Sequence, residues 1–192
     1  VFYDQCPRQY QPASSKWRDN RRVRFQIPPS VRPWLLDEAS LTEHLMRCSG
    51  GAFRVQLQLQ YWGLPDHSER DALGLAARQV ALLRETLLLV REQAWVYARS
   101  VIPASTLSGS NRRLRSLGNR SLGSWLFHAP DMQRSPFEVA LLQPGHSPVP
   151  AQLQRDFPLW GRRSRFEVHG APLLVCEIFL PDFVPWPTIG AS

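Results

Sequence analysis

Cysteine is scarce in this 192-residue chain, which contains only Cys6, Cys48 and Cys176. Three cysteines at such wide spacing are too few for the disulfide framework of a small secreted domain. The CxxC and HExxH spacings are missing as well, and the five histidines lie far apart. We therefore expect no metal site, and the cytoplasm is the compartment that this cysteine content favours.

Long apolar runs are also missing. The run at 87–90 (LLLV) is typical and has charged residues on both sides, whereas a membrane helix needs roughly 18–20 apolar residues. The N-terminus lacks the charged-then-apolar pattern of a signal peptide. Gly50-Gly51 lacks the GK[ST] ending of a phosphate-binding loop, and no Ser/His/Asp pattern occurs. We expect a protein without stable membrane insertion.

Lysine is nearly absent, because Lys16 is the only lysine among 23 basic residues, which face 16 acidic ones for a net charge of +7. Arginine presents a planar fork that binds carboxylate and phosphate groups through paired hydrogen bonds. The excess fits genomic base composition, a nucleic-acid partner or a small anionic ligand. In the basic cluster at 159–165 (LWGRRSR), alternation makes one face basic, which is a weak nucleic-acid signal. The cluster by itself is typical of solvent-exposed residues at the beginning of a strand.

Composition divides the chain into one domain and two tails. Residues 1–22 are polar without periodicity and are interpreted as a flexible N-terminal tail. Residues 23–183 are assigned to a single domain, and 184–192 to an irregular C-terminal tail rich in proline. Within the domain, 143–158 holds four prolines and a glycine and is typical of a long surface loop.

Alternating polar and apolar residues predict a sheet. In the clearest case Phe53, Val55, Leu57 and Leu59 alternate with polar residues. The predicted strands are 53–60, 80–90, 94–102, 137–142, 163–168 and 172–180. The short link at 91–93 indicates a hairpin, and therefore antiparallel pairing.

Short helices are predicted between these strands. The expected helices are 31–36 with Ser30 as its cap, about two turns after the Ser40-Leu41-Thr42-Glu43 capping box, 111–117 and 121–127. The last two should cross one edge or face of the sheet. The fold class is α+β, a single antiparallel sheet with short helices added.

Two charged residues occupy strand positions where the pattern favours apolar ones. Glu177 shares a face with Val175 and Phe179, and Arg84 shares a face with Leu82 and Thr86. An unpaired charge in such surroundings is costly. The two residues therefore indicate either a structural ion pair or a pocket with an anion-binding group at one end and a carboxylate at the other.

Several short segments, taken in order, resemble the bacterial chorismate pyruvate-lyases of ubiquinone biosynthesis. They extend over most of the chain, from about Trp34 to Pro181. The segments are 34–36 (WLL), 40–42 (SLT), 83–85 (LRE), 98–103 (ARSVIP), 105–109 (STLSG), 117–118 (LG), 122–123 (LG), 126–127 (LF), 159–164 (LWGRRS), 172–174 (PLL) and 177–181 (EIFLP). Departures from the family pattern are the polar N-terminal tail, the loop at 143–158, and Leu41 at a position that is often Met.

The resemblance implies a set of site residues and a reaction. Arg84 and Glu177 match the charged catalytic and ligand-binding residues of the family, and Leu41 and Leu122 match positions whose backbone contacts the ligand. The implied fold has helical flaps over a buried pocket. The implied reaction converts chorismate to 4-hydroxybenzoate and pyruvate, the first committed step of ubiquinone biosynthesis, with no cofactor and no metal.

The roles implied for the two charged residues follow from the substrate, which is a dianion. Arg84 is assigned to a substrate carboxylate, and Glu177 to the hydroxyl end of the ring. Whether Glu177 orients the substrate or transfers a proton stays open. The alternative function is a non-catalytic effector-binding domain of the same fold. We expect chorismate as the only partner, no nucleic acid, and a monomer.

Overall fold

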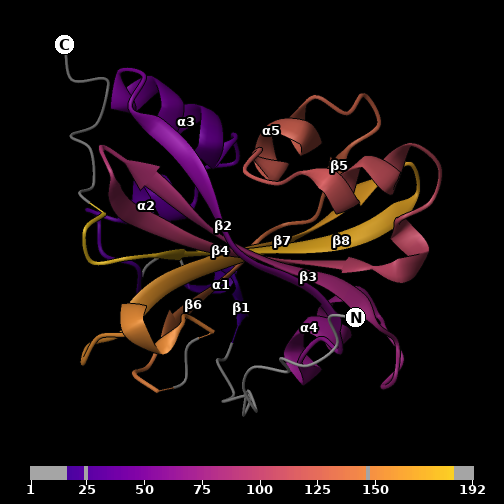
Figure 1. The fold of residues 1–192 in the computed structure, drawn as a ribbon. Coiled ribbons are helices and arrows are strands. Elements are labelled where there is room, and N and C mark those ends of the chain that lie inside the picture. Colours follow the sequence, from indigo (N-terminus) through magenta and orange to yellow (C-terminus); the bar gives the residue numbers. More distant parts are fainter. Residues whose placement is uncertain (1–16, 24–25, 146–147, 184–192) are drawn as a thin grey trace.

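The computed structural model describes residues 17–23, 26–145 and 148–183. In this part of the chain an eight-stranded antiparallel sheet forms the centre of the molecule, with short helices on both faces (Figure 1). The α+β class predicted from the alternating pattern is therefore confirmed. The predicted tail at 184–192 lies outside the described residues, as do residues 1–16.

The strands pair in the order β1-β6-β7-β8-β4-β3-β2, with β5 beside β7. Every pairing is antiparallel. The strands are β1 (Arg18–Asp19), β2 (Phe53–Gly63), β3 (Ala81–Val90), β4 (Gln93–Pro103), β5 (Gln133–Arg134), β6 (Glu138–Leu142), β7 (Leu159–Val168) and β8 (Ala171–Phe179). Six of these strands were predicted with small differences at the ends, and the two-residue strands β1 and β5 were not.

Two tight turns fix the register of the central strands. Arg91 and Glu92 link β3 to β4 with positive φ angles of 50° and 65°, and His169 and Gly170 link β7 to β8 with φ angles of 53° and 69°. Two consecutive positive φ angles give the turn a twist that matches the right-handed twist of the strands. The hairpin predicted from the short link and the turn predicted at His169-Gly170 are both confirmed.

The helices differ more from the sequence-based expectations. The structure has α1 (Asn20–Val23), α2 (Arg32–Leu35), α3 (Leu41–Ser49), α4 (His67–Leu73), α5 (Leu122–Phe127) and the 3-10 turns η2 (Ala104–Thr106), η3 (Gly109–Ser116) and η4 (Ala151–Leu153). The segment predicted as a helix at 111–117 is the 3-10 turn η3. The segment predicted at 121–127 is α5.

The capping residues at the helix N-termini agree only in part with the sequence-based predictions. Ser40 caps α3 as predicted, because its Oγ accepts a hydrogen bond from the N–H of Glu43 at 3.3 Å. The prediction of Ser30 as a cap is wrong, since α2 begins after Val31 and has no side-chain cap. The helix α4 was missed although Asp66 and Glu69 form a complete capping box at its start.

The N-terminal boundary of the domain also differs from the prediction. Arg18 and Asp19, assigned to the tail at 1–22, pair with Val139 and Glu138 of β6. The helix α1 follows directly. The boundary placed at residue 22 is therefore too late, because a two-residue edge strand carries no periodic signal.

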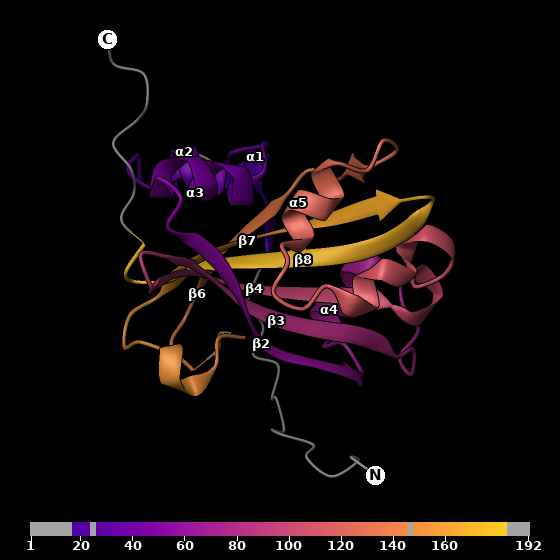
Figure 2. The same cartoon turned by 45° about the horizontal axis from the view of Figure 1, so that its top comes forward.

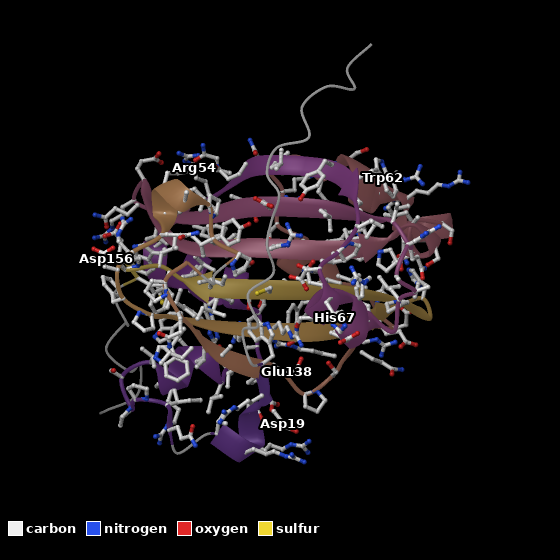
Figure 3. The ribbon with its side chains drawn as sticks, turned by 90° about the horizontal axis from the view of Figure 1, so that it is seen from below. Asp19, Arg54, Trp62, His67, Glu138 and Asp156 are labelled. Carbon is white, nitrogen blue, oxygen red and sulfur yellow. The ribbon has the colours of Figure 1, made fainter. Side chains whose placement is uncertain are left out.

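The two faces of the sheet are covered by different elements. One face packs against α2, α3, α5 and η3 through two apolar clusters, and Figure 2 shows α2, α3 and α5 on that side of the sheet. The opposite face packs against α4 and the segment around η4; Figure 3 views this side, with His67 of α4 labelled. Polar residues between the two clusters of the first face form the candidate site.

Candidate functional site

Strand register brings the charged residues of the first face together. Arg84 on β3 lies opposite Ser100 on β4, and Glu177 on β8 lies opposite both Ala98 on β4 and Arg162 on β7. With strands about 4.8 Å apart and a rise of about 3.4 Å per residue, the Cα atoms of Arg84 and Glu177 are about 12 Å apart. Two long side chains converging from that separation leave room for one small ring.

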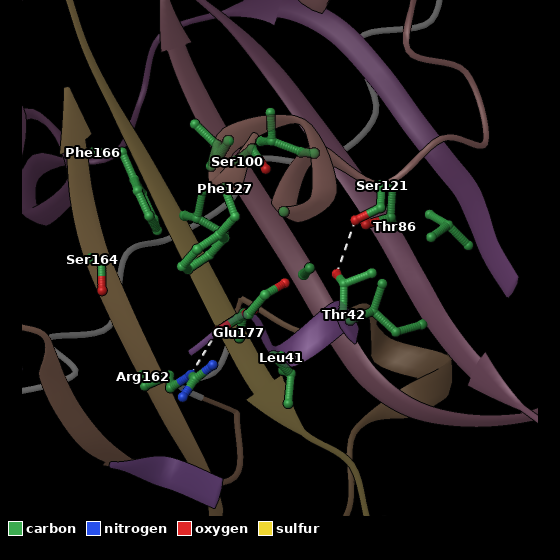
Figure 4. A pocket seen from close by; sticks show the side chains of 18 of the residues that line it. Leu41, Thr42, Thr86, Ser100, Ser121, Phe127, Arg162, Ser164, Phe166 and Glu177 are labelled. Carbon is green, nitrogen blue, oxygen red and sulfur yellow. Dashed lines mark hydrogen bonds and ion pairs between the residues drawn. The ribbon is translucent and has the colours of Figure 1, made fainter. Parts of the chain in front are cut away.

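A narrow cavity occupies this space beneath α3 and α5 (Figure 4). Its polar lining comprises Ser40, Thr42, Arg84, Thr86, Ser100, Ser121, Arg134, Arg162, Ser164 and Glu177. Its apolar lining comprises Ala39, Leu41, Val55, Leu88, Ala98, Leu122, Gly123, Leu126, Phe127, Phe166 and Val175. The open volume of the cavity is only about 40 Å³, so its walls lie close together.

Arg84 is a buried cation on the floor of this cavity. The residue is 2% exposed, and its Nη2 donates to the carbonyl oxygens of Gly118 and Arg120 at 2.8 and 2.9 Å. Its Nε is buried without a hydrogen-bond partner, and within the described residues Arg84 makes no ion pair. Burial lowers the pKa of Arg84 to about 10, which is the electrostatic sign of a charge that lacks compensation.

Glu177 has a different partner from the one considered in the sequence analysis. Its Oε2 accepts a hydrogen bond from Nε of Arg162 at 2.6 Å, so Arg84 and Glu177 do not neutralise each other. Arg162 is almost fully buried and also donates to the carbonyl oxygens of Trp34 and Asp37 at 2.9 and 2.8 Å. Because β7, α2 and the following loop all hold Arg162, the carboxylate of Glu177 is fixed in position (Figure 4).

Leu41 and Leu122 are the first residues of α3 and α5, and both line the cavity. The helix caps Ser40 and Ser121 precede them. The first N–H groups of a helix have no acceptor within the helix. The structure thus brings all four residues singled out from the sequence to one cavity.

The two helices above the cavity are joined to each other. The hydroxyl oxygens of Thr42 and Ser121 are 2.9 Å apart and share a hydrogen bond. The backbone of α5 also approaches the side chain of Thr42 on α3 closely, since a Cβ added at Gly123 would lie 2.9 Å from Oγ1 of Thr42. A side chain at position 123 would push the helices apart, which explains why glycine stands there.

Two arginines of the cavity were missed from the sequence. Arg162 was interpreted as part of a solvated basic strand entry, and this interpretation is wrong because Arg162 and Arg163 are 1% and 7% exposed. The sequence did contain a signal for the position of Arg162, because alternation along the strand places it on the same face as Ser164 and Phe166. Arg134 lies on the two-residue strand β5, where no periodicity marks it.

Arg134 is held against the wall of the cavity by both polar and aromatic contacts. Its Nε donates to Oγ of Ser164 at 2.9 Å, and its Nη1 donates to the carbonyl oxygen of Glu38 at 3.0 Å. Its guanidinium lies 5.0 Å from the ring centre of Phe137 and 5.2 Å from that of Phe166. Burial, and secondarily Arg162, lower the pKa of Arg134 to about 10.

Two further features bear on the class of protein. Across the ranges 17–23, 26–145 and 148–183, no three His, Cys, Asp or Glu side chains are placed together so that they could hold a metal ion. In the same ranges no helix has the length and apolar character needed to span a membrane.

The chain is similar to a defined set of known proteins. The family model for chorismate lyase matches residues 12–185. A probable chorismate pyruvate-lyase of Methylococcus capsulatus is 42% identical over 159 residues, which cover 82% of this chain and 98% of the relative. A probable chorismate pyruvate-lyase of Pseudomonas fluorescens is 43% identical over 162 residues, which cover 84% of each chain.

Solved structures resemble the fold at much lower sequence identity. The effector domain of PhnF from Mycobacterium smegmatis has a TM-score of 0.54 and 14% identity, over 82% of this chain and 98% of that domain. Such a likeness concerns the fold alone. The family-model match and the 42–43% identity to the curated relatives carry the assignment: the chain belongs to the chorismate lyase family.

Proposed function

We propose that this protein is a chorismate lyase, which converts chorismate to 4-hydroxybenzoate and pyruvate. The observation that carries the proposal is the buried guanidinium of Arg84, which faces a small cavity and has no carboxylate partner in the described residues. A buried charge of this kind is strongly unfavourable unless a ligand compensates it. A carboxylate ligand supplies that compensation.

Arg84 binds the ring carboxylate of chorismate in this proposal. Its Nη2 is occupied by two backbone carbonyls, whereas its Nε has no partner. Within the described residues Nε and Nη1 make no hydrogen bond, so these two nitrogens are left to donate to a carboxylate oxygen. A hydrogen bond between two charged groups is shorter and stronger than a neutral one.

Glu177 receives the hydroxyl on ring C4, opposite the carboxylate. One oxygen of Glu177 is taken by Arg162, which leaves the other to accept a hydrogen bond from the substrate. The ion pair with Arg162 at 2.6 Å holds the carboxylate in one orientation, so this second oxygen has a fixed position. This contact favours orientation of the substrate over proton transfer as the role of Glu177.

The reaction needs little more than correct positioning. The bond between ring C3 and the enolpyruvyl oxygen breaks, and its electron pair leaves with the oxygen as enolpyruvate. The C4 hydrogen leaves as a proton, and its electron pair completes the aromatic ring. Enolpyruvate then takes up a proton on its methylene carbon and becomes pyruvate. Aromatisation drives the reaction, so the protein holds the reactive conformer and balances charge.

The helices α3 and α5 serve as the flaps over the ligand. The free N–H groups at Leu41 and Leu122 are available to a bound carboxylate or hydroxyl. The hydrogen bond between Thr42 and Ser121 closes the cavity from above. With so little open volume beneath it, substrate entry and product release require that this contact opens.

The broader setting of the reaction rests on the family resemblance. In this proposal the product enters ubiquinone biosynthesis, of which the lyase reaction is the first committed step. The protein acts in the cytoplasm as a monomer, with neither a nucleic-acid partner nor a cofactor. The domain is proposed to extend from β1, which begins at Arg18, to residue 183.

A direct assay tests the function. Purified protein mixed with chorismate should release 4-hydroxybenzoate and pyruvate in equal amounts, and a chelator should leave the rate unchanged. Binding of 4-hydroxybenzoate without any turnover of chorismate would instead support the non-catalytic effector-binding alternative, which the fold also permits.

Replacement of Arg84 tests the anion-binding role. Arg84→Gln removes the charge but keeps a donor for the carbonyls of Gly118 and Arg120. We expect an affinity for 4-hydroxybenzoate about 10–150-fold lower, because a hydrogen bond to a charged group contributes about 1.5–3 kcal/mol. Calorimetric titration measures this affinity, with the exposed Arg112→Gln as the control for net charge. Unchanged affinity in a folded Arg84→Gln protein would remove Arg84 from the site.

Replacement of Glu177 separates its two candidate roles. If Glu177 orients the substrate, Glu177→Gln should lower kcat by about 10-fold or less, since one hydrogen bond contributes about 0.5–1.5 kcal/mol. Loss of a group that transfers the proton costs roughly 10²–10⁴-fold. Steady-state kinetics across pH distinguish the two, and a loss beyond 10²-fold would contradict the orienting role.

A further inference from the structure

Besides Arg84, the cavity contains a second arginine without an ion pair in the described residues, Arg134, to which the proposed function assigns no role. Arg134 reaches the cavity from β5, and its Nη2 makes no hydrogen bond within the described residues. Its Nε and Nη1 are fixed by Ser164 and Glu38, and aromatic rings flank its guanidinium. A guanidinium held this rigidly, with one nitrogen left over, is preorganised to bind an anion.

The charges of the cavity do not balance without a ligand. The charged lining residues are Arg84, Arg134, Arg162 and Glu177. Arg162 and Glu177 neutralise each other in an ion pair. Neither Arg84 nor Arg134 forms an ion pair within the described part of the chain. Two positive charges therefore remain, and chorismate carries two carboxylates.

The arrangement along β7 places the second cation at the correct end of the substrate. Arg134 pairs with Phe166, and its side chain returns along β7 to Ser164, two residues from Arg162. Arg162 lies directly opposite Glu177. Arg134 is therefore at the Glu177 side of the cavity, away from Arg84. In chorismate the enolpyruvyl ether is on C3, next to the C4 hydroxyl that Glu177 is proposed to receive.

We propose that Arg134 binds the carboxylate of the enolpyruvyl side chain of chorismate and so determines specificity for a dicarboxylate. This inference rests on the proposed lyase function. It gives each carboxylate of the substrate its own arginine. Only the ring carboxylate, on Arg84, is retained in 4-hydroxybenzoate.

The same contact assists departure of the side chain. When the C3–O bond breaks, the electron pair moves onto the oxygen of enolpyruvate, which already carries a carboxylate. Arg134, fixed beside that group, stabilises the added negative charge without reorganising. After the enolpyruvate takes up a proton and becomes pyruvate, the charge on the group falls and its hold on Arg134 weakens.

The test compares substrate and product in one variant. Arg134→Gln should lower kcat/KM for chorismate by about 10–150-fold, which is the worth of a charged hydrogen bond. Inhibition by 4-hydroxybenzoate should change less than about 2-fold, because the product lacks the second carboxylate. Arg134→Lys keeps the charge without the planar fork and should recover part of kcat/KM. The control is Arg165→Gln on β7, which loses an equal charge from a 40% exposed side chain.

Each outcome of this comparison decides the inference. Equal losses of chorismate turnover and product affinity would mean that Arg134 only supports the wall of the cavity, and would overturn it. Unchanged kcat/KM in Arg134→Gln would overturn it as well. If Arg134→Gln does not fold, the Lys variant makes the same comparison, and a parallel fall in both quantities there contradicts the inference. Absence of turnover in the wild-type protein would refute the lyase function itself, which is a separate result.

Discussion

The cost of burying a positive charge without a partner governs this structure. Arg84 lies on β3 and is 2% exposed, and its only side-chain hydrogen bonds within the described residues go to two backbone carbonyls. A protein interior tolerates such a group only when other features of the fold maintain it. Here the two carbonyls belong to Gly118 and Arg120, in the loop that leads into α5. Arg84 is thus hydrogen-bonded to the segment that leads into α5. In the proposed function this contact couples binding of the anion to closure of the flap.

On the opposite face of the sheet, away from the cavity, buried arginines are paired with carboxylates. Arg99, on the neighbouring strand β4, donates to Glu69 at 2.6 Å and to Glu85 at 2.8 Å. Arg163 donates to Glu138 at 2.8 Å. These buried cations are paired, and the pair between Arg99 and Glu69 fastens α4 to the sheet. Among the described arginines that line the cavity, only Arg162 has a carboxylate partner. The difference between the two faces supports the proposed roles of Arg84 and Arg134 in binding the substrate.

The sequence predicted what depends on periodicity and failed where contacts are distant or segments are short. Alternation identified the six long strands, and it exposed Arg84 and Glu177 as charges in apolar positions. The family resemblance added Leu41 and Leu122, which the structure brings to the same cavity. Arg134 could not be found, because its role comes from a two-residue strand that reaches the cavity only in the folded sheet. The turn at His169-Gly170 sets the β7–β8 register that pairs Arg162 with Glu177, but the predicted strand began at residue 163 and so left Arg162 out.

One comparison of ligands tests the central claim, that the carboxylate of the ligand compensates the buried charge of Arg84. The neutral analogue 4-hydroxybenzamide has nearly the same shape as 4-hydroxybenzoate but no charge. Calorimetric titration of the wild-type protein with both compounds should give at least about 10-fold weaker binding for the amide, since the charged hydrogen bond is lost. Equal affinity for the two compounds would contradict the account, because the buried guanidinium would then not be recognising an anion.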